Sequence, residues 1–293
     1  MSFLSYFING ISLGSIYAII ALGYTMVYGI AKMLNFAHGD IIMVGAFTTF
    51  TVVSTRGGNP VMGILAAVLV CTVLGVTIER VAYRPLRGAS PLAVLITAIG
   101  VSYLLQNVAL LLFGSNSKQF TSVVNIPALK LADGQLSISG VTMVTIASCI
   151  VIMIVLTTFI NKTKMGQAML AVSEDKGAAT LMGIDVNRTI AVTFAIGSAL
   201  AAIAGVLLCS AYPSLTPYTG SMPGIKAFVA AVFGGIGSIP GAMIGGIILG
   251  VIENLSKAYI SSQLSDAIVF SVLIIVLLVR PTGILGKTIH EKV

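Results

Sequence analysis

Charged residues are scarce in this chain. Only 9% of its 293 residues are Asp, Glu, Lys or Arg, and it contains no tryptophan. A soluble globular domain carries roughly 25% charged residues, so this composition excludes an ordinary water-solvated domain. The hydrophobic content of 57% and the mean hydropathy of +1.06 instead indicate a chain solvated mainly by lipid. Because several apolar runs reach the length of about 20 residues that a spanning helix needs, we predict an all-α polytopic membrane protein, with one transmembrane domain over residues 1–293.

Motifs for enzymatic or metal chemistry are also missing from the sequence. Cys71, Cys149 and Cys209 each lie alone inside an apolar run, which predicts small core residues without a metal or a disulfide. No HExxH, GxSxG or paired-carboxylate arrangement occurs, so we predict no enzyme and no cofactor. Gly286-Lys287-Thr288 resembles the end of a phosphate-binding loop, but proline occupies the position of its first glycine. The net charge of +7 is spread over short loops, which does not indicate a nucleic-acid-binding surface.

The apolar segments predict about eight spanning helices plus a broken or re-entrant hairpin near 224–253. In the hairpin, an apolar stretch too short to span is followed by the break Gly234–Gly241 and a second helix. Discontinuous helices of this kind line transport pathways, although a tight hairpin between two buried helices is the alternative. Within the break, the candidates for lining or gating the pathway are Gly235, Gly237 and Pro240. The other segments run over about 6–30, 41–53, 61–78, 91–113, 141–160, 190–209 and 267–279.

Another break, earlier in the chain at residues 34–40, separates the first two apolar segments. It places three polar side chains, Asn35, His38 and Asp40, near membrane depth. Such residues are costly in lipid, which marks the stretch as a candidate functional site. The alternative is a short, wet turn at the membrane interface. We include Asn35, His38, Gly39 and Asp40 among the translocation or gating candidates, and we expect Asp40 and His38 to hydrogen-bond protein backbone rather than hold substrate.

The distribution of basic residues predicts the orientation of the chain. With residues 80–87, 161–188, Lys32 and the C-terminal segment on one side, that side holds 11 of the 16 Lys and Arg residues. Cytoplasmic loops carry the excess of positive charge, so we expect an external N-terminus and a cytoplasmic C-terminus. The loop 161–188 is then cytoplasmic. The polar, alternating loop 114–140 is external, and we expect it to be β-like, with a hairpin turn at Asp133-Gly134.

The cytoplasmic loop contains a predicted short helix, residues 174–182. Ser173 is a suitable N-cap, acidic residues follow it in the first turn, and Gly183 supplies a left-handed stop. A helix of this length is marginal alone in water, so we expect it to dock against the membrane surface or a cytoplasmic partner. Its exposed face is predicted to include Ala178, Leu181 and Met182.

These motifs together resemble one family, the branched-chain amino-acid ABC transporter permeases of the LivH type. The resemblance covers nearly the whole chain, in the right order. It rests on Asn35–Asp40 with the preceding 14–23, on 174–185, on 227–241 and on Arg280-Pro281-Thr282-Gly283. Leu170 departs from the family pattern, because a basic residue is expected ahead of the acidic helix start.

The resemblance implies a larger importer in the cytoplasmic (inner) membrane. Its other parts are a second related permease subunit, two cytoplasmic ATPase subunits that hydrolyse ATP, and an external or periplasmic amino-acid-binding protein. The substrate is Leu, Ile, Val or a related amino acid, with short amides or urea left open. The residues expected to couple this chain to the ATPases are Ser173, Glu174, Asp175, Ala178, Ala179, Leu181 and Gly183.

An ion-coupled secondary transporter or channel is the alternative function. Asp40 and His38 would then form a proton or cation site, since broken helices and an intramembrane acid also fit that class. The scarcity of charges at membrane depth and the absence of a convincing internal duplication argue against it. Dependence of uptake on an ion gradient rather than on ATP distinguishes the two functions.

Overall fold

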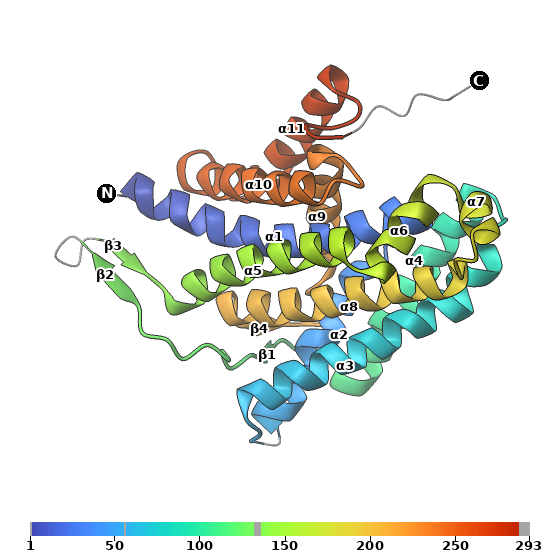
Figure 1. Ribbon diagram of the computed structural model, residues 1–293. Coiled ribbons are helices and arrows are strands. Elements are labelled where there is room, and N and C mark those ends of the chain that lie inside the picture. The colour runs from blue at the N-terminus through green and yellow to red at the C-terminus, as the bar shows by residue number, and fades with distance from the viewer. Residues whose placement is uncertain (1, 56, 132–135, 287–293) are drawn as a thin grey trace.

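The computed structural model describes residues 2–55, 57–131 and 136–286, and it is largely helical. Helices α1, α5, α8 and α10 run alongside one another (Figure 1). Helices α6 and α7 lie at one end of this bundle, and strands β2 and β3 lie at the other end, near the N-terminus (Figure 1). The helices are α1 (Ser2–Ala31), α2 (His38–Phe50), α3 (Pro60–Ile78), α4 (Pro91–Phe113), α5 (Gly140–Lys162), α6 (Lys164–Glu174), α7 (Lys176–Leu181), α8 (Val186–Ala211), α9 (Ser221–Gly234), α10 (Ile239–Tyr259) and α11 (Ser265–Val279), with π-helical turns η1 (Thr51–Thr55) and η2 (Glu79–Tyr83) and the 3-10 turn η3 (Arg84–Leu86).

The all-α membrane class is confirmed, but the predicted count of about eight spanning helices is not. In the described part of the chain, six helices are long and apolar enough to cross a membrane, and three shorter apolar helices accompany them. The shorter ones are His38–Ser54, Ser221–Gly234 and Ser265–Val279. The difference arises because two of these short helices adjoin the breaks at residues 34–40 and 234–241 and start or end there.

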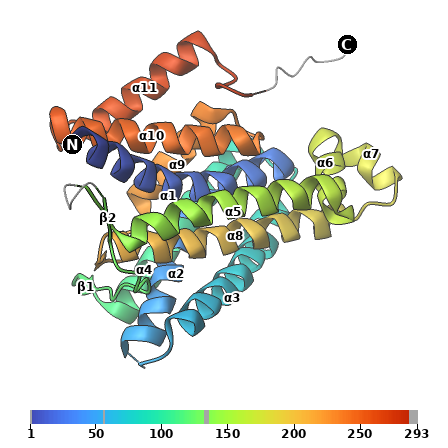
Figure 2. The same cartoon turned by 60° about the vertical axis from the view of Figure 1, so that its left-hand side comes forward.

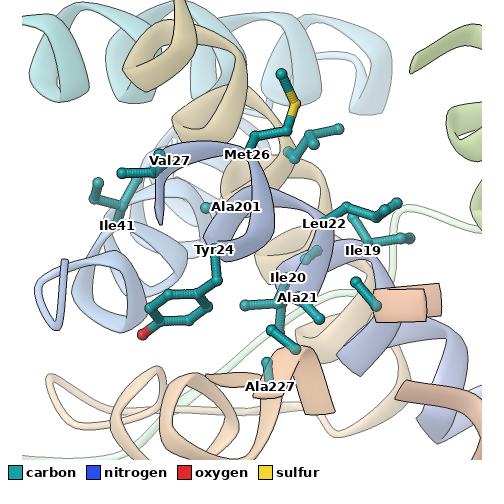
Figure 3. Close-up of a cluster of buried hydrophobic side chains, with 14 of the residues drawn as sticks. Ile19, Ile20, Ala21, Leu22, Tyr24, Met26, Val27, Ile41, Ala201 and Ala227 are labelled. Atoms are coloured by element: carbon teal, nitrogen blue, oxygen red, sulfur yellow. The ribbon is translucent and has the colours of Figure 1, made fainter. Parts of the chain in front are cut away.

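The helices differ sharply in burial, which separates a core from a periphery. The most apolar stretch of α1 is 94% buried and that of α8 is 72% buried, against 22% for α4 and for α5. Figure 3 shows side chains of α1, including Ile20 and Leu22, packed with residues of neighbouring helices such as Ile41 and Ala227. The three cysteines are buried and unpaired, as predicted for small core residues. Helix α11 lies on α10 and extends away from the rest of the bundle (Figure 2).

Two small antiparallel ladders cover the end of the bundle opposite α7. Strand β1 (Lys118–Gln119) pairs with β4 (Ser214–Leu215), and β2 (Leu129–Leu131) pairs with β3 (Leu136–Ile138). The predicted β-like character of the loop 114–140 is therefore confirmed. Its predicted turn residues, Asp133-Gly134, lie outside the described residues.

Close backbone packing joins α1 to α10. A Cβ on Gly14 would lie only 2.6 Å from the Cα of Ile247, and a Cβ on Gly246 would lie 2.5 Å from the Cα of Ala18. In lipid, apolar contact between helices brings little gain, so small residues that let backbones approach closely supply much of the packing energy. The glycines four residues apart in α1 and in α10 therefore define the interface that holds the core together.

Replacing Gly14 with leucine tests this packing. The new side chain meets backbone atoms of α10 rather than a mobile side chain. We therefore expect the free energy of unfolding to fall by about 1–3 kcal/mol, as in other overpacked cores. Gly100→Leu in α4 is the matched control, because nothing lies within 4 Å of a Cβ at that position. Thermal unfolding of the purified variants in detergent measures the difference. Equal midpoints for the two variants contradict the packing account.

Candidate translocation site and coupling elements

The two helix breaks predicted from the sequence lie next to each other in the fold. A Cβ on Gly39, at the start of α2, would lie 2.7 Å from the carbonyl oxygen of Gly220, just before α9. A Cβ on Gly29 would lie 3.2 Å from the Cα of Gly237, in the second break. A small cavity of about 10 Å³ is lined by residues of both breaks, among them Asn35 and Ile236. Segments about 200 residues apart in sequence thus form one irregular region inside the bundle.

The second break, residues 235–238, has a defined geometry. Gly235 and Gly237 adopt φ angles of +104° and +93°, which favour glycine over residues with a Cβ. Ser238 caps α10 by accepting a hydrogen bond from the backbone N–H of Gly241, and Pro240 occupies the first turn, where its missing N–H costs nothing. The predicted interruption of the 224–253 hairpin is therefore confirmed, between α9 and α10.

A segment after α11 completes the second break, which the sequence did not indicate. The backbone N–H of Ile284 donates to the carbonyl of Phe233 over 2.9 Å, and that of Leu285 donates to the carbonyl of Gly234 over 3.0 Å. These carbonyls belong to the last turn of α9, where no intrahelical donor is available. The Arg280–Gly283 motif therefore leads into the residues that cap α9, which is a structural role for this motif.

The first break, predicted at 34–40, spans residues 32–37 between α1 and α2, and a buried side-chain pair anchors it. The hydroxyl of Tyr83, in η2, donates to Oδ1 of Asn35 over 2.9 Å, and both side chains are buried. Just before the break, Nζ of Lys176 in α7 donates to the carbonyl of Ala31, the last residue of α1, over 2.9 Å. A cation at this position complements the negative end of the helix dipole. The first break is thus connected both to η2 and to α7.

Asp40 has a side-chain partner on another helix. Its Oδ1 accepts a hydrogen bond from Nε2 of Gln106, in α4, over 2.9 Å. The same amide nitrogen lies 3.2 Å from the hydroxyl of Ser102 and 3.3 Å from that of Ser221. Gln106 therefore joins helices α2, α4 and α9.

His38 lies beside Asp40 but points into aromatic surroundings. Its ring centroid is 4.6 Å from that of Tyr24, at an interplanar angle of 60°. Its Nε2 has no hydrogen-bond partner among the described residues. His38 and Asp40 are thus held by different neighbours, and the described side chains do not form a cluster of His, Cys, Asp or Glu able to hold a metal.

A larger cavity of about 380 Å³ lies between α2, α4 and α9. We call it the Asp40 cavity. One part of its wall is polar, with the carboxylate of Asp40, the amide of Gln106 and the two serine hydroxyls that surround it. The remaining wall is largely apolar. Its lining residues are Phe36, Gly39, Asp40, Leu95, Ile99, Ser102, Tyr103, Gln106, Ser221 and Ile225.

The loop 161–188 forms two helices, α6 and α7, rather than the single helix predicted over 174–182. Glu174 is the last residue of α6, not part of a first turn, and the hydroxyl of Ser173 donates to the carbonyl of Leu170. Asp175 is the N-cap of α7: its Oδ1 accepts from the backbone N–H groups of Gly177 (2.7 Å) and Ala178 (2.9 Å). The prediction of Ser173 as N-cap is therefore wrong. The chain becomes extended at Asp175, and only that side chain reaches the free N–H groups.

The exposed face predicted for this loop is present. Leu181 is 90% exposed and Met182 is 82% exposed, and Ala178 is also exposed, whereas Ala179 is buried against the protein. Gly183 adopts φ +81°, so the predicted left-handed stop is confirmed. Two large apolar side chains thus protrude from one end of the bundle.

Two buried carboxylates with basic partners were missed by the sequence analysis. Glu79 is fully buried and pairs with Arg87, which also contacts the side chain of Asn187 at the start of α8. At the other site, Glu253 of α10 pairs with Lys226 (2.8 Å).

Further partners complete the Glu253 network. Lys257 lies 2.6 Å from the Glu253 carboxylate, and the hydroxyl of Tyr17 donates to it over 2.8 Å. Lys226 also pairs with Asp266 in α11 over 2.6 Å. The network joins α1, α9, α10 and α11. The signal available in the sequence was a lysine, Lys226, and a glutamate, Glu253, inside two largely apolar helices.

Comparison with known proteins identifies the family. The family model described as "Branched-chain amino acid transport system / permease component" matches residues 6–277. This chain belongs to that family. It is 47% identical to the high-affinity branched-chain amino acid transport system permease protein LivH of Salmonella typhimurium, over 99% of this chain and 98% of that protein. It is 45% identical to the corresponding permease protein BraD of Pseudomonas aeruginosa, over 99% and 98%. A probable branched-chain amino acid transport permease of Methanocaldococcus jannaschii is 31% identical over 92% and 88%.

The Glu253 network predicts unequal roles for its two lysines. Lys226→Met leaves a buried carboxylate without its buried counter-charge, and we expect a loss of about 3–5 kcal/mol in stability. Lys257→Met is the matched control, because Lys257 is 39% exposed and such pairs contribute about 0–1 kcal/mol. Unfolding of the two variants in detergent measures both values. A larger loss for Lys257→Met contradicts this reading of the network.

Proposed function

We propose that this permease translocates leucine, isoleucine, valine or related amino acids across the cytoplasmic membrane, as one transmembrane subunit of an ATP-driven importer. The observation that carries the proposal is the near-full-length match to permeases of branched-chain amino acid transport systems, in the family to which this chain belongs. The chain itself does not hydrolyse ATP. ATPase partners and an external amino-acid-binding protein complete the importer, and we infer two ATPases and a second related permease.

The orientation inferred from the basic residues supports this assignment of partners. An external N-terminus puts α6 and α7 in the cytoplasm, where the ATPases bind, and the strands of the 114–140 loop outside, where a binding protein arrives. Leu181 and Met182, protruding from α7, are the groups that we assign to ATPase docking. Both side chains are exposed in the permease alone, so an apolar contact with an ATPase subunit would remove them from water.

A physical connection links the proposed docking surface to the helix breaks. Lys176, in the first turn of α7, holds the carbonyl of Ala31 at the edge of the first break. Burial lowers the pKa of Lys176, and the charges of Arg87 and Lys32 lower it further. Movement of α7 therefore acts on the end of α1, on the Asn35–Tyr83 pair and on the region where the two breaks meet. We infer that this region opens and closes the pathway.

ATP-dependent uptake tests the proposal. The permease, copurified with its partner subunits and reconstituted in liposomes with the binding protein, is expected to accumulate radiolabelled leucine only with ATP enclosed on the ATPase side. Uptake by the permease alone, or uptake driven by an ion gradient without ATP, contradicts the proposal and supports the ion-coupled alternative, in which Asp40 and His38 would form a cation site.

Substitution of Leu181 tests the docking surface. Leu181→Asp places a charge where an apolar contact is expected, so the affinity for the ATPase subunits should fall by at least about tenfold, or about 1.4 kcal/mol. Gln119→Asp, an exposed substitution at the opposite end of the bundle, is the control. Copurification and stimulated ATP hydrolysis measure the effect. Normal copurification of Leu181→Asp shows that α7 docks elsewhere.

A further inference from the structure

We propose that the Asp40 cavity is a transient binding site for the amino acid in transit, with the Asp40 carboxylate accepting hydrogen bonds from the substrate's ammonium group. This inference rests on the proposed function, and it adds the residues and the chemistry that recognise the substrate inside the permease. It reverses our expectation that Asp40 hydrogen-bonds protein backbone rather than holding substrate.

Asp40 lacks the counter-charge that the other two buried carboxylates of the described residues have. Asp40, Glu79 and Glu253 are all almost fully buried, with exposures of 2%, 0% and 1%. Glu79 pairs with arginine and Glu253 with two lysines, but over the described ranges no Lys, Arg or His forms an ion pair with Asp40. A buried carboxylate is stable when a cation or several hydrogen bonds compensate its lost hydration. The cationic group of a passing amino acid supplies such compensation for a limited time.

The polar wall around the carboxylate has few donors. Gln106 contributes a single amide nitrogen with two N–H groups, and three oxygens lie within 3.3 Å of it, from Asp40, Ser102 and Ser221. The hydroxyls of Ser102 and Ser221 add one O–H donor each, whereas the ionised carboxylate alone accepts about four hydrogen bonds and each hydroxyl accepts about two. The polar wall therefore has more acceptor sites than donors, and an ammonium group, with three N–H donors, complements it.

The remaining wall of the Asp40 cavity is largely apolar. Leu95, Ile99 and Ile225 face the same cavity as Asp40, so a branched aliphatic side chain finds an apolar surface beside the polar wall. The volume of about 380 Å³ lies in the range of about 300–1,000 Å³ typical of small-molecule pockets. The hydroxyl of Ser221 is a neutral group available to the substrate carboxylate. No basic residue lines the cavity among the described residues, which keeps binding weak, as release requires.

Asp40→Asn tests the charge without removing the contact to Gln106, because asparagine retains an oxygen that accepts from the amide. We expect leucine uptake by the reconstituted complex to fall at least about tenfold, because the substrate's ammonium group loses one charge-assisted hydrogen bond. ATP hydrolysis stimulated by the loaded binding protein and copurification of the subunits are expected to stay within about twofold of wild type. Asp40→Glu, which keeps the charge, is expected to recover part of the uptake. A purely structural Asp40 predicts a common loss of assembly, hydrolysis and uptake, or no loss at all, and either result overturns the proposal.

A second variant tests the apolar wall. Ile99→Phe narrows the cavity and is expected to reduce the uptake of leucine more than that of alanine. Ile96→Phe is the matched control, because Ile96 lies on the same helix, is 60% exposed and does not line the cavity. Equal leucine-to-alanine ratios for the two variants overturn the assignment of the wall.

The outcomes separate this inference from the proposed function. If the wild-type complex takes up no amino acid but takes up an uncharged amide or urea, the proposed substrate class fails, and the ammonium site fails with it. If the wild type takes up leucine and Asp40→Asn does so at the same rate, the proposed function stands and the assignment of Asp40 fails.

Discussion

The cost of leaving a buried charge uncompensated in the membrane governs the interior of this permease. Glu79 satisfies this constraint with Arg87, which follows η3, and Glu253 satisfies it with Lys226 of α9 and Lys257 of α10. Asp40 forms no ion pair with a basic residue in the described part of the chain, and it accepts a hydrogen bond from Gln106. Because a fully paired group is a structural element and an incompletely paired one is available to a ligand, the three carboxylates have different roles even though their burial is the same.

Irregular backbone near Asp40 depends on a second constraint, the need to satisfy backbone polar groups without water. Two helix breaks meet where glycines let the chain segments approach, and the carbonyls at the end of α9 are capped by residues 284 and 285. The first break is tied to α7 through Lys176. Direct contacts therefore connect the end that we assign to ATPase docking with the break region, while the close packing of α1 against α10 keeps the core in place.

Much of this could be predicted from the sequence, and the failures have identifiable physical causes. Apolar run length and the positions of glycine and proline are local properties, so the membrane class and both breaks were accessible. Ser173 was assigned as N-cap because it has a suitable side chain, yet Asp175 takes that role where the chain becomes extended. The contacts of Asp40 with Gln106 and of Glu253 with Lys226 join different helices, and no local pattern identifies such pairs. The count of about eight spans is not confirmed, because short helices that start or end at a break cannot be told from full spans by hydropathy.

The most direct test of the account is to give Asp40 the counter-charge that it lacks. Gln106→Lys places an ammonium group beside the carboxylate, since Nε2 of Gln106 lies 2.9 Å from it. The account predicts a complex at least as heat-stable as the wild type, with leucine uptake reduced at least about tenfold because the lysine occupies the site of the substrate's ammonium group. Uptake at the wild-type rate with this lysine in place would contradict the claim that Asp40 receives the substrate.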